Sequence, residues 1–134
     1  MKVDPINPKN WARPSGYSNA SLARGATAFL FVAGQIAWDE NQKLVGAGDF
    51  VAQFRQALSN VRTVVRAGGA YPSDIVRLTL YVVDKQQYQS NLKEIGVAYS
   101  EVLGRSYPAM SLVQVAGLLE DDALVEIEAT AAIG

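Results

Sequence analysis

The spacing of apolar residues predicts two amphipathic helices, one starting near residue 49 and the other ending near residue 103. In each segment the apolar residues recur every three or four positions, which is the repeat of one helix face. Asp49 is a plausible N-cap of the first helix, and Gly68 and Gly104 are plausible stops for the two helices. The two apolar stripes are Phe50, Phe54, Ala57, Leu58, Val61, Val64 and Val65, and Tyr88, Leu92, Ile95, Tyr99, Val102 and Leu103.

Other segments have the alternating or continuous apolar pattern of β-strands. Residues 75–83 alternate, with Leu78 and Leu80 on one side and Thr79 and Tyr81 on the other, and residues 124–133 alternate in the same way. Residues 26–33 are apolar at both odd and even positions, which predicts a strand covered on both faces. Gly34 and Gln35 are expected to end this strand or to form a bulge in it. Weaker strand signals lie at 18–23, 44–45 and 109–116.

These elements predict an α+β fold in the order β-β-β-α-β-α-β-β, as one domain spanning residues 1–134. Residues 1–14 are expected to form an irregular lead-in. Because each helix is followed by a strand, both helices are expected to pack on the same face of one sheet. The other face would then be open to water or to a partner, and self-association is the simplest way to cover it.

Composition removes several classes of function. The 134 residues carry a net charge of −1 and include neither histidine nor cysteine. This excludes a Ser-His-Asp triad, a Cys-His pair and a zinc site built from His or Cys. Lys and Arg are scattered without a basic run, which weighs against nucleic-acid binding. There is no apolar run of membrane-spanning length and no signal-peptide pattern, so we expect no membrane association and a cytoplasmic location.

Several polar residues on the predicted strands are candidates for chemistry. Glu126 and Glu128 share one face of the last strand, where a carboxylate held in a cleft can orient or deprotonate water. Taken alone, the pair is better explained as part of a solvated strand face. Arg77 is expected to pair with one of these carboxylates across the sheet. Tyr17 follows a turn and is either an exposed ring or a hydrogen-bonding group at a cleft mouth.

Taken together, six segments resemble the reactive intermediate deaminase family, RidA/YjgF, over nearly the whole chain after residue 14. They are Gly16-Tyr17-Ser18, Val32-Ala33-Gly34-Gln35-Ile36, Gln56-Ala57-Leu58-Ser59-Asn60-Val61, Asp74-Ile75-Val76-Arg77-Leu78-Thr79-Leu80-Tyr81-Val82, Tyr107-Pro108-Ala109 and Val125-Glu126-Ile127-Glu128-Ala129. The resemblance implies a chorismate-mutase-like fold and a homotrimer whose sheets line a central β-barrel. It also implies small-metabolite clefts between subunits, and hydrolysis of reactive imines or enamines to keto acids and ammonia without a metal or cofactor.

The resemblance also assigns residues. Glu126 matches the glutamate that positions water, Tyr17 the cleft tyrosine, and Gly34 the glycine at the cleft backbone. Met110 stands where the family has the arginine that binds the substrate carboxylate, and methionine cannot make that bidentate bond. Ser111 is expected beside Met110 in the binding site. Supporting roles are expected for Arg77, Glu128 and Gln114, and Arg24, Arg77 and Arg105 are candidates for a replacement cation.

The sequence therefore predicts a RidA-like deaminase whose substrate is an imine or enamine other than the usual 2-imino acids. Two alternatives stay open. One is a non-catalytic trimer on the same fold that binds or senses a small metabolite. The other is an endoribonuclease, and the acidic pI of about 5.3 and the missing histidine weigh against it.

Overall fold

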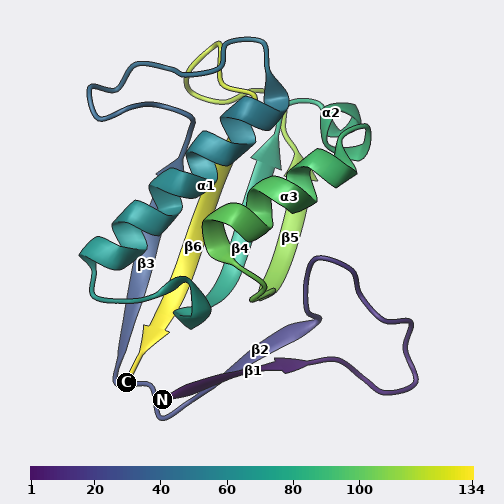
Figure 1. Cartoon of the computed structure of the whole chain (residues 1–134), viewed down its shortest axis with the longest axis vertical. Helices are drawn as coiled ribbons and strands as arrows, with labels where there is room; N and C mark the ends of the chain where they lie inside the picture. The colour runs from purple at the N-terminus through teal and green to yellow at the C-terminus, as the bar shows by residue number, and fades with distance from the viewer.

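The computed structural model describes all residues, 1–134, and shows an α+β fold with two helices across one face of a sheet. A separate two-stranded hairpin lies beside this body, and the two chain ends lie close together (Figure 1). The elements are β1 (Lys2–Ile6), β2 (Ala20–Arg24), β3 (Ala28–Gln35), α1 (Phe50–Ala67), a 3₁₀ turn (Pro72–Asp74), β4 (Ile75–Val82), α2 (Lys85–Gln89), α3 (Leu92–Leu103), β5 (Ala109–Gln114) and β6 (Val125–Ile133).

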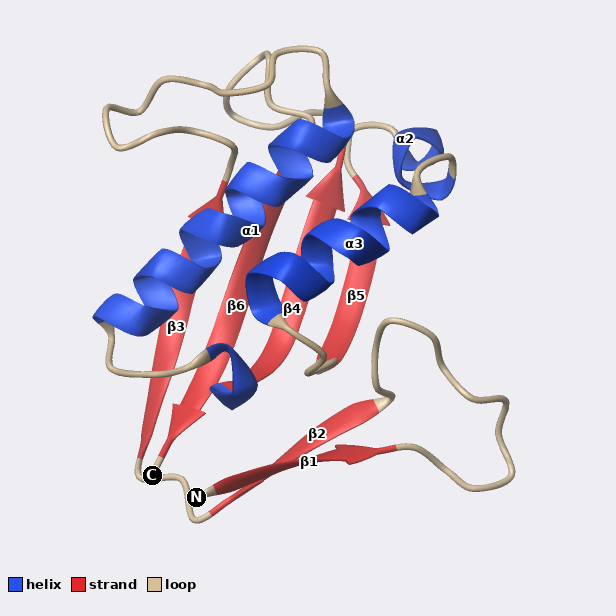
Figure 2. Ribbon diagram, viewed as in Figure 1, coloured by secondary structure: helices blue, strands red, loops and turns tan.

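The main sheet has four strands in the order β3-β6-β4-β5. Strand β6 is antiparallel to both β3 and β4, whereas β4 and β5 are parallel and are joined through α2 and α3. Helices α1 and α3 lie side by side on one face of this sheet, as the sequence predicts (Figure 2). No helix combines the length and the apolar character that crossing a membrane requires.

The core lies between these helices and the sheet. Alternate residues of β4 and β6, among them Leu78, Leu80 and Ile127, are buried against the apolar stripes of α1 and α3. The predicted ends of α1 are confirmed: the Asp49 side chain accepts a hydrogen bond from the backbone N–H of Ala52, and Gly68 is the C-cap. Gly104, with φ 80°, ends α3 as expected.

The predicted helix around residues 88–103 is wrong in one respect, because it is two helices. Helix α2 ends at Gln89 and α3 begins at Leu92. Asn91 turns its side-chain amide to the carbonyl oxygen of Gln87, at 2.6 Å. Such local side-chain bonds compete with helical hydrogen bonds and interrupt the helix, although the apolar stripe continues across the break.

The expectation of an irregular lead-in is also wrong for Lys2–Ile6, which forms strand β1 and pairs antiparallel with β2. Pro5 favours a loop in a sequence reading, but a two-stranded ribbon has free edges where a residue without an N–H is tolerated. The weak signal at 44–45 is not a strand either, since Leu44 makes only an isolated bridge with Trp38.

The face of the sheet away from the helices is open in the single chain. On β3, Phe29 is 59% exposed and Phe31 is 77% exposed, whereas Val32 is buried beneath the helices. The prediction that this strand is covered on both faces therefore fails within one chain. Large apolar side chains seldom lie this exposed without a partner, so the open face is a candidate for contact with another molecule.

Candidate functional site

The open face of the sheet carries a row of polar side chains from the two central strands. In register, Tyr81 of β4 lies opposite Glu126 of β6, and Thr79 lies opposite Glu128. Both glutamates and Tyr81 are half-buried. The alternation of faces predicted for the last strand is confirmed, because Val125 and Ile127 point into the core whereas Glu126 and Glu128 lie on the open face.

The two carboxylates differ in their contacts. The Tyr81 hydroxyl donates a hydrogen bond to the Glu128 carboxylate. This bond, with partial desolvation and the two negative charges nearby, raises the pKa of Tyr81 above its usual value of 10.0. The Glu126 side chain has no hydrogen-bond partner within the chain. Glu126 is therefore the carboxylate free to bind water or a ligand.

The predicted pairing of Arg77 with one of these glutamates is wrong. The ion pairs of the chain are Lys2–Asp4, Arg24–Asp4 and Arg55–Glu101. The neighbour of Arg77 on β6 is Thr130, and the strand is irregular between Ile75 and Arg77. Because the Tyr81 hydroxyl already bonds to Glu128, that carboxylate does not depend on Arg77.

Gly34 and Glu126 come together at an irregularity in β3. The register of β3 against β6 shifts between Val32 and Gln35, which confirms the bulge expected at Gly34. A β-carbon built on Gly34 would lie 2.7 Å from both the carboxyl carbon and Oε2 of Glu126. Glycine is needed here for space, since any side chain would displace the carboxylate from the Gly34 backbone.

Tyr17 lies in a different place, on the arm between β1 and β2, and its side chain is 40% exposed. The arm is attached to the start of β5 by Ser18, whose N–H and Oγ donate to the carbonyl oxygens of Pro108 and Tyr107 at 3.1 and 2.6 Å. The Ala109 N–H donates to Oγ of Ser21 at 2.9 Å. Between the arm and the loop before β5 lies a cavity of about 660 Å³, which Tyr17 and Arg105 both line.

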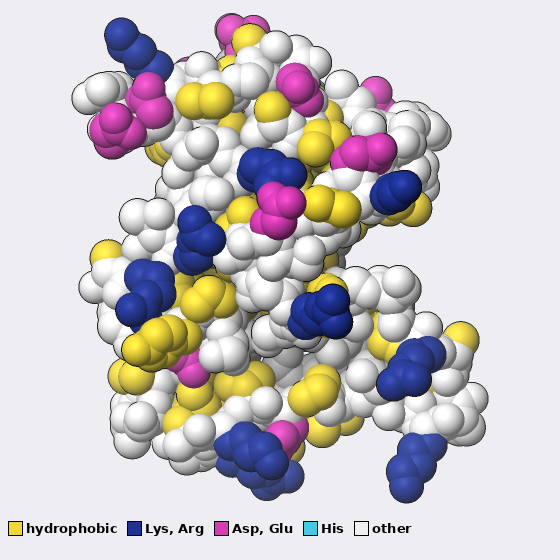
Figure 3. Space-filling model, viewed as in Figure 1, with side chains coloured by type: hydrophobic (Ala, Val, Ile, Leu, Met, Phe, Trp, Pro, Cys, Tyr) yellow, Lys and Arg dark blue, Asp and Glu magenta, His cyan; other side chains and the backbone are white.

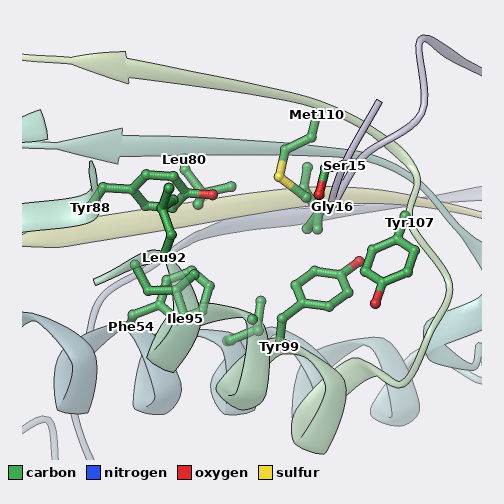
Figure 4. Close-up of a pocket in the computed structure, with 13 residues that line it drawn as sticks. Ser15, Gly16, Phe54, Leu80, Tyr88, Leu92, Ile95, Tyr99, Tyr107 and Met110 are labelled. Atoms are coloured by element: carbon green, nitrogen blue, oxygen red, sulfur yellow. The ribbon is translucent and has the colours of Figure 1, made fainter. Parts of the chain in front are cut away.

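Met110 lies on the helix side of β5, opposite Leu78 of β4. Its side chain lines a second cavity, of about 350 Å³, between α3 and the sheet. Figure 4 shows the sulfur of Met110 directed into this space from the strand, with Phe54, Ile95 and Tyr99 reaching it from the helices. The sequence did not predict this cavity, because an apolar stripe does not reveal where packing leaves a gap.

The other candidates lie apart from Met110. Ser111 is exposed on the opposite face of β5, next to Thr79. Gln114 accepts a hydrogen bond from the Lys85 N–H at 2.9 Å, which joins the end of β5 to the start of α2. No group of three or more His, Cys, Asp or Glu side chains has an arrangement suited to a metal ion. Within one chain the candidates thus form two groups, Gly34 with Glu126 on the open face, and Tyr17 and Met110 at cavities around β5.

Comparison with protein families gives one match that spans most of the chain. Residues 11–133 match the family described as Endoribonuclease L-PSP. A RutC family protein of Pyrococcus horikoshii is 34% identical over 123 residues, which is 92% of each chain. A RutC family protein of a Synechocystis strain is 33% identical over 121 residues.

Solved structures agree with these sequence matches. A protein of the Rid family from Yersinia pestis, described as of unknown function, is 38% identical and superposes with a TM-score of 0.87, covering 99% of this chain and 100% of that one. The YjgF gene product of E. coli is 29% identical with a TM-score of 0.65, covering 96% of this chain and 98% of that one. The predicted fold and the predicted family are confirmed by these similarities.

Proposed function

Because the chain belongs to the Endoribonuclease L-PSP family, which includes the RidA/YjgF proteins that it resembles, we propose that it hydrolyses a reactive imine or enamine. An enamine first tautomerises to the imine. Water then adds to the imine carbon, the carbon–nitrogen bond breaks, and the products are a carbonyl compound and ammonia.

The contact between Gly34 and Glu126 is the observation that carries this proposal. The Glu126 carboxylate is half-buried, has no protein hydrogen bond and lies against a backbone that carries no side chain. In the proposed reaction it takes a proton from water as the oxygen attacks carbon and passes it to the nitrogen. When the carbon–nitrogen bond breaks, it takes the proton of the new hydroxyl group and passes this proton to the leaving nitrogen. Glu128 accepts the hydrogen bond from Tyr81 of the neighbouring strand β4, so it has no part in this proton transfer.

We further propose that the active form is a homotrimer with the site between subunits. The exposed Phe29 and Phe31 on the open sheet face would be covered by a second copy. Such a contact would also bring the Gly34–Glu126 pair of one subunit near the β5 cavities of its neighbour. This arrangement accounts for the separation of the candidate residues within one chain.

Met110 makes the usual 2-imino acids poor substrates in this proposal. Loss of a charged hydrogen bond to a carboxylate costs roughly 1.5–3 kcal/mol, which corresponds to about a ten- to hundredfold loss of rate. RNA cleavage is not proposed, because the chain has no histidine and its Lys and Arg side chains are scattered over the face shown in Figure 3.

The test is release of ammonia from a panel of imines generated in the assay mixture, compared with the rate in buffer alone. We expect acceleration for some members of the panel and slow turnover of 2-iminobutyrate. No acceleration for any imine would reject the hydrolase and leave the binding function, for which the apolar cavity beside Met110 is the supporting observation.

A further inference from the structure

We propose that the two cavities beside β5 together bind a small molecule with an apolar, ring-sized body and an anionic group. The body would lie under α3 against Met110, and the anion would lie at Arg105 and Arg13 beneath the N-terminal arm. As a statement about the substrate this inference rests on the proposed imine hydrolysis, but the binding itself can be measured separately.

The cavity under α3 is suited to an uncharged body. Of its 13 lining residues 10 are hydrophobic, and no charged side chain is among them. Its volume of about 350 Å³ lies within the range of small-molecule sites. The rings of Tyr88 and Tyr99 reach it from opposite ends, as Figure 4 shows. A charged group placed here would lose its hydration without gaining a partner.

The cavity beneath the arm has the opposite character. Only 4 of its 15 lining residues are hydrophobic, and its charged side chains are Arg13 and Arg105. Neither arginine takes part in an ion pair. Hydroxyl groups from Ser15, Tyr17 and other residues complete the lining. Guanidinium and hydroxyl donors without a carboxylate favour an anionic ligand, and arginine binds planar carboxylates with two hydrogen bonds.

The two cavities adjoin each other. Ser15, Gly16 and Tyr107 line both of them. The Tyr107 ring stacks on Tyr99, with ring centroids 5.2 Å apart and an angle of 18° between the planes. A ligand lying across this shared wall would place its apolar end against Met110 and its anionic end toward Arg105.

The test uses three probe molecules on the full chain, with binding measured by calorimetry. Phenylacetate has both a ring and a carboxylate, acetate has only the carboxylate, and benzyl alcohol has only the ring. We expect phenylacetate to bind at least tenfold more tightly than either of the others. Equal affinity for acetate and phenylacetate, or no binding of phenylacetate at millimolar concentration, would overturn the proposal.

Variants separate the two cavities. Arg105→Gln combined with Arg13→Gln should weaken the binding of phenylacetate at least tenfold and leave the affinity for benzyl alcohol unchanged. Leu92→Gln should weaken the binding of both ligands. This variant is expected to fold because Leu92 is 58% exposed. Lys93→Gln removes a charge outside both cavities and should change neither affinity. An unchanged affinity for phenylacetate in the double arginine variant would reject the anion site.

The binding test and the hydrolysis test can fail separately. Phenylacetate binding as expected, in a protein that accelerates no imine hydrolysis, would retain the paired cavities and reject the hydrolase. Hydrolysis without the expected binding pattern would retain the hydrolase and reject the paired cavities.

Discussion

The Tyr81 hydroxyl donates a hydrogen bond to the Glu128 carboxylate, and this contact distinguishes two glutamates that share one face of β6. Tyr81 lies opposite Glu126 in the strand register, yet its hydroxyl bonds to the neighbour two residues further along. One carboxylate is therefore part of the sheet's own hydrogen bonding, and the other is available for chemistry.

Glu126→Gln is expected to abolish imine hydrolysis while the protein keeps its fold and oligomeric state. Glutamine keeps the shape and one acceptor oxygen but cannot take a proton from water. The measurements are ammonia release, melting temperature and sedimentation. Full activity in this variant would remove Glu126 from the reaction and leave a binding protein.

Glu128→Gln is the matched control for that experiment. The glutamine oxygen can still accept the hydrogen bond from Tyr81, so activity should fall much less than in Glu126→Gln. An equal loss of melting temperature in both variants, with no selective loss of activity, would indicate that the two residues serve only the sheet.

Gly34→Ala is expected to reduce hydrolysis strongly, because the added methyl group would lie only 2.7 Å from the Glu126 carboxylate and would displace it. Gly117→Ala serves as the control, since a β-carbon on Gly117 meets no atom within 4 Å. Steady-state rates for the two variants check this prediction. A fully active Gly34→Ala protein would show that the carboxylate can work from another position.

The sequence predicts best those elements whose residues repeat with a clear period. The stripe of α1 and the alternation in β6 give both the element and its buried face, because one side of each must pack against the core. Strand β1 is not predicted, because Pro5 is typical of a loop and this segment becomes a strand only by pairing with β2. The paired residues lie 14 to 22 positions apart, and pairing at this separation leaves no local pattern.

The candidate site is predictable only in part. The resemblance gives Glu126, Gly34 and Tyr17, and in the structure the first two lie in close contact. The Tyr81–Glu128 bond and the cavity shared by Tyr17 and Arg105 depend on side-chain directions and on how the arm folds back. Neither follows from spacing along the chain.

Phe31→Glu is expected to convert the proposed trimer to a monomer. The Phe31 ring is 77% exposed on the open face, so a charge costs the single chain little but would be buried at a subunit contact. Leu119→Glu is the control, because Leu119 is 93% exposed and lies outside the sheet. Sedimentation at micromolar concentration checks this. A monomeric parent protein would contradict the trimer directly.

Gln53→Leu is expected to lower the free energy of unfolding by about 1–3 kcal/mol or more, because it leaves buried polar groups unpaired. The Gln53 side chain is fully buried within α1. Its amide donates to the carbonyl oxygens of Gly46 and Asp122, and its oxygen accepts from the Leu124 N–H at 2.8 Å. Urea unfolding measures the change, and Gln86→Leu on the exposed side of α2 should be nearly neutral. Equal stability of the two variants would show that these bonds contribute little.

Stability should fall as the pH rises above 10, and Tyr99 is expected to be one source of this fall. The Tyr99 ring is buried against α1 and the sheet, and its hydroxyl donates to the Ser106 carbonyl oxygen at 2.6 Å. Burial, with a smaller contribution from the Tyr107 hydroxyl nearby, raises the pKa of Tyr99 well above its ordinary value of 10.0.

The direction of this change in stability follows from the number of protons that the folded and unfolded states bind. Below pH 9 the tyrosine is protonated in both states, so its contribution is constant. Above pH 10 the unfolded chain loses this proton while the folded chain keeps it, and the free energy of unfolding falls by about 1.4 kcal/mol per pH unit for each such group. Burial also raises the pKa of Tyr88, so its effect adds to the slope.

Tyr99→Phe separates the contribution of this residue. At pH 8 the variant should be less stable by about 1 kcal/mol, since it lacks the hydrogen bond to Ser106. Above pH 10 its stability should fall less steeply than that of the parent, so the difference between the two proteins should shrink with rising pH. Urea unfolding at pH 8, 9, 10 and 11 measures both effects. Parallel pH profiles would show that Tyr99 ionises alike in the folded and unfolded states.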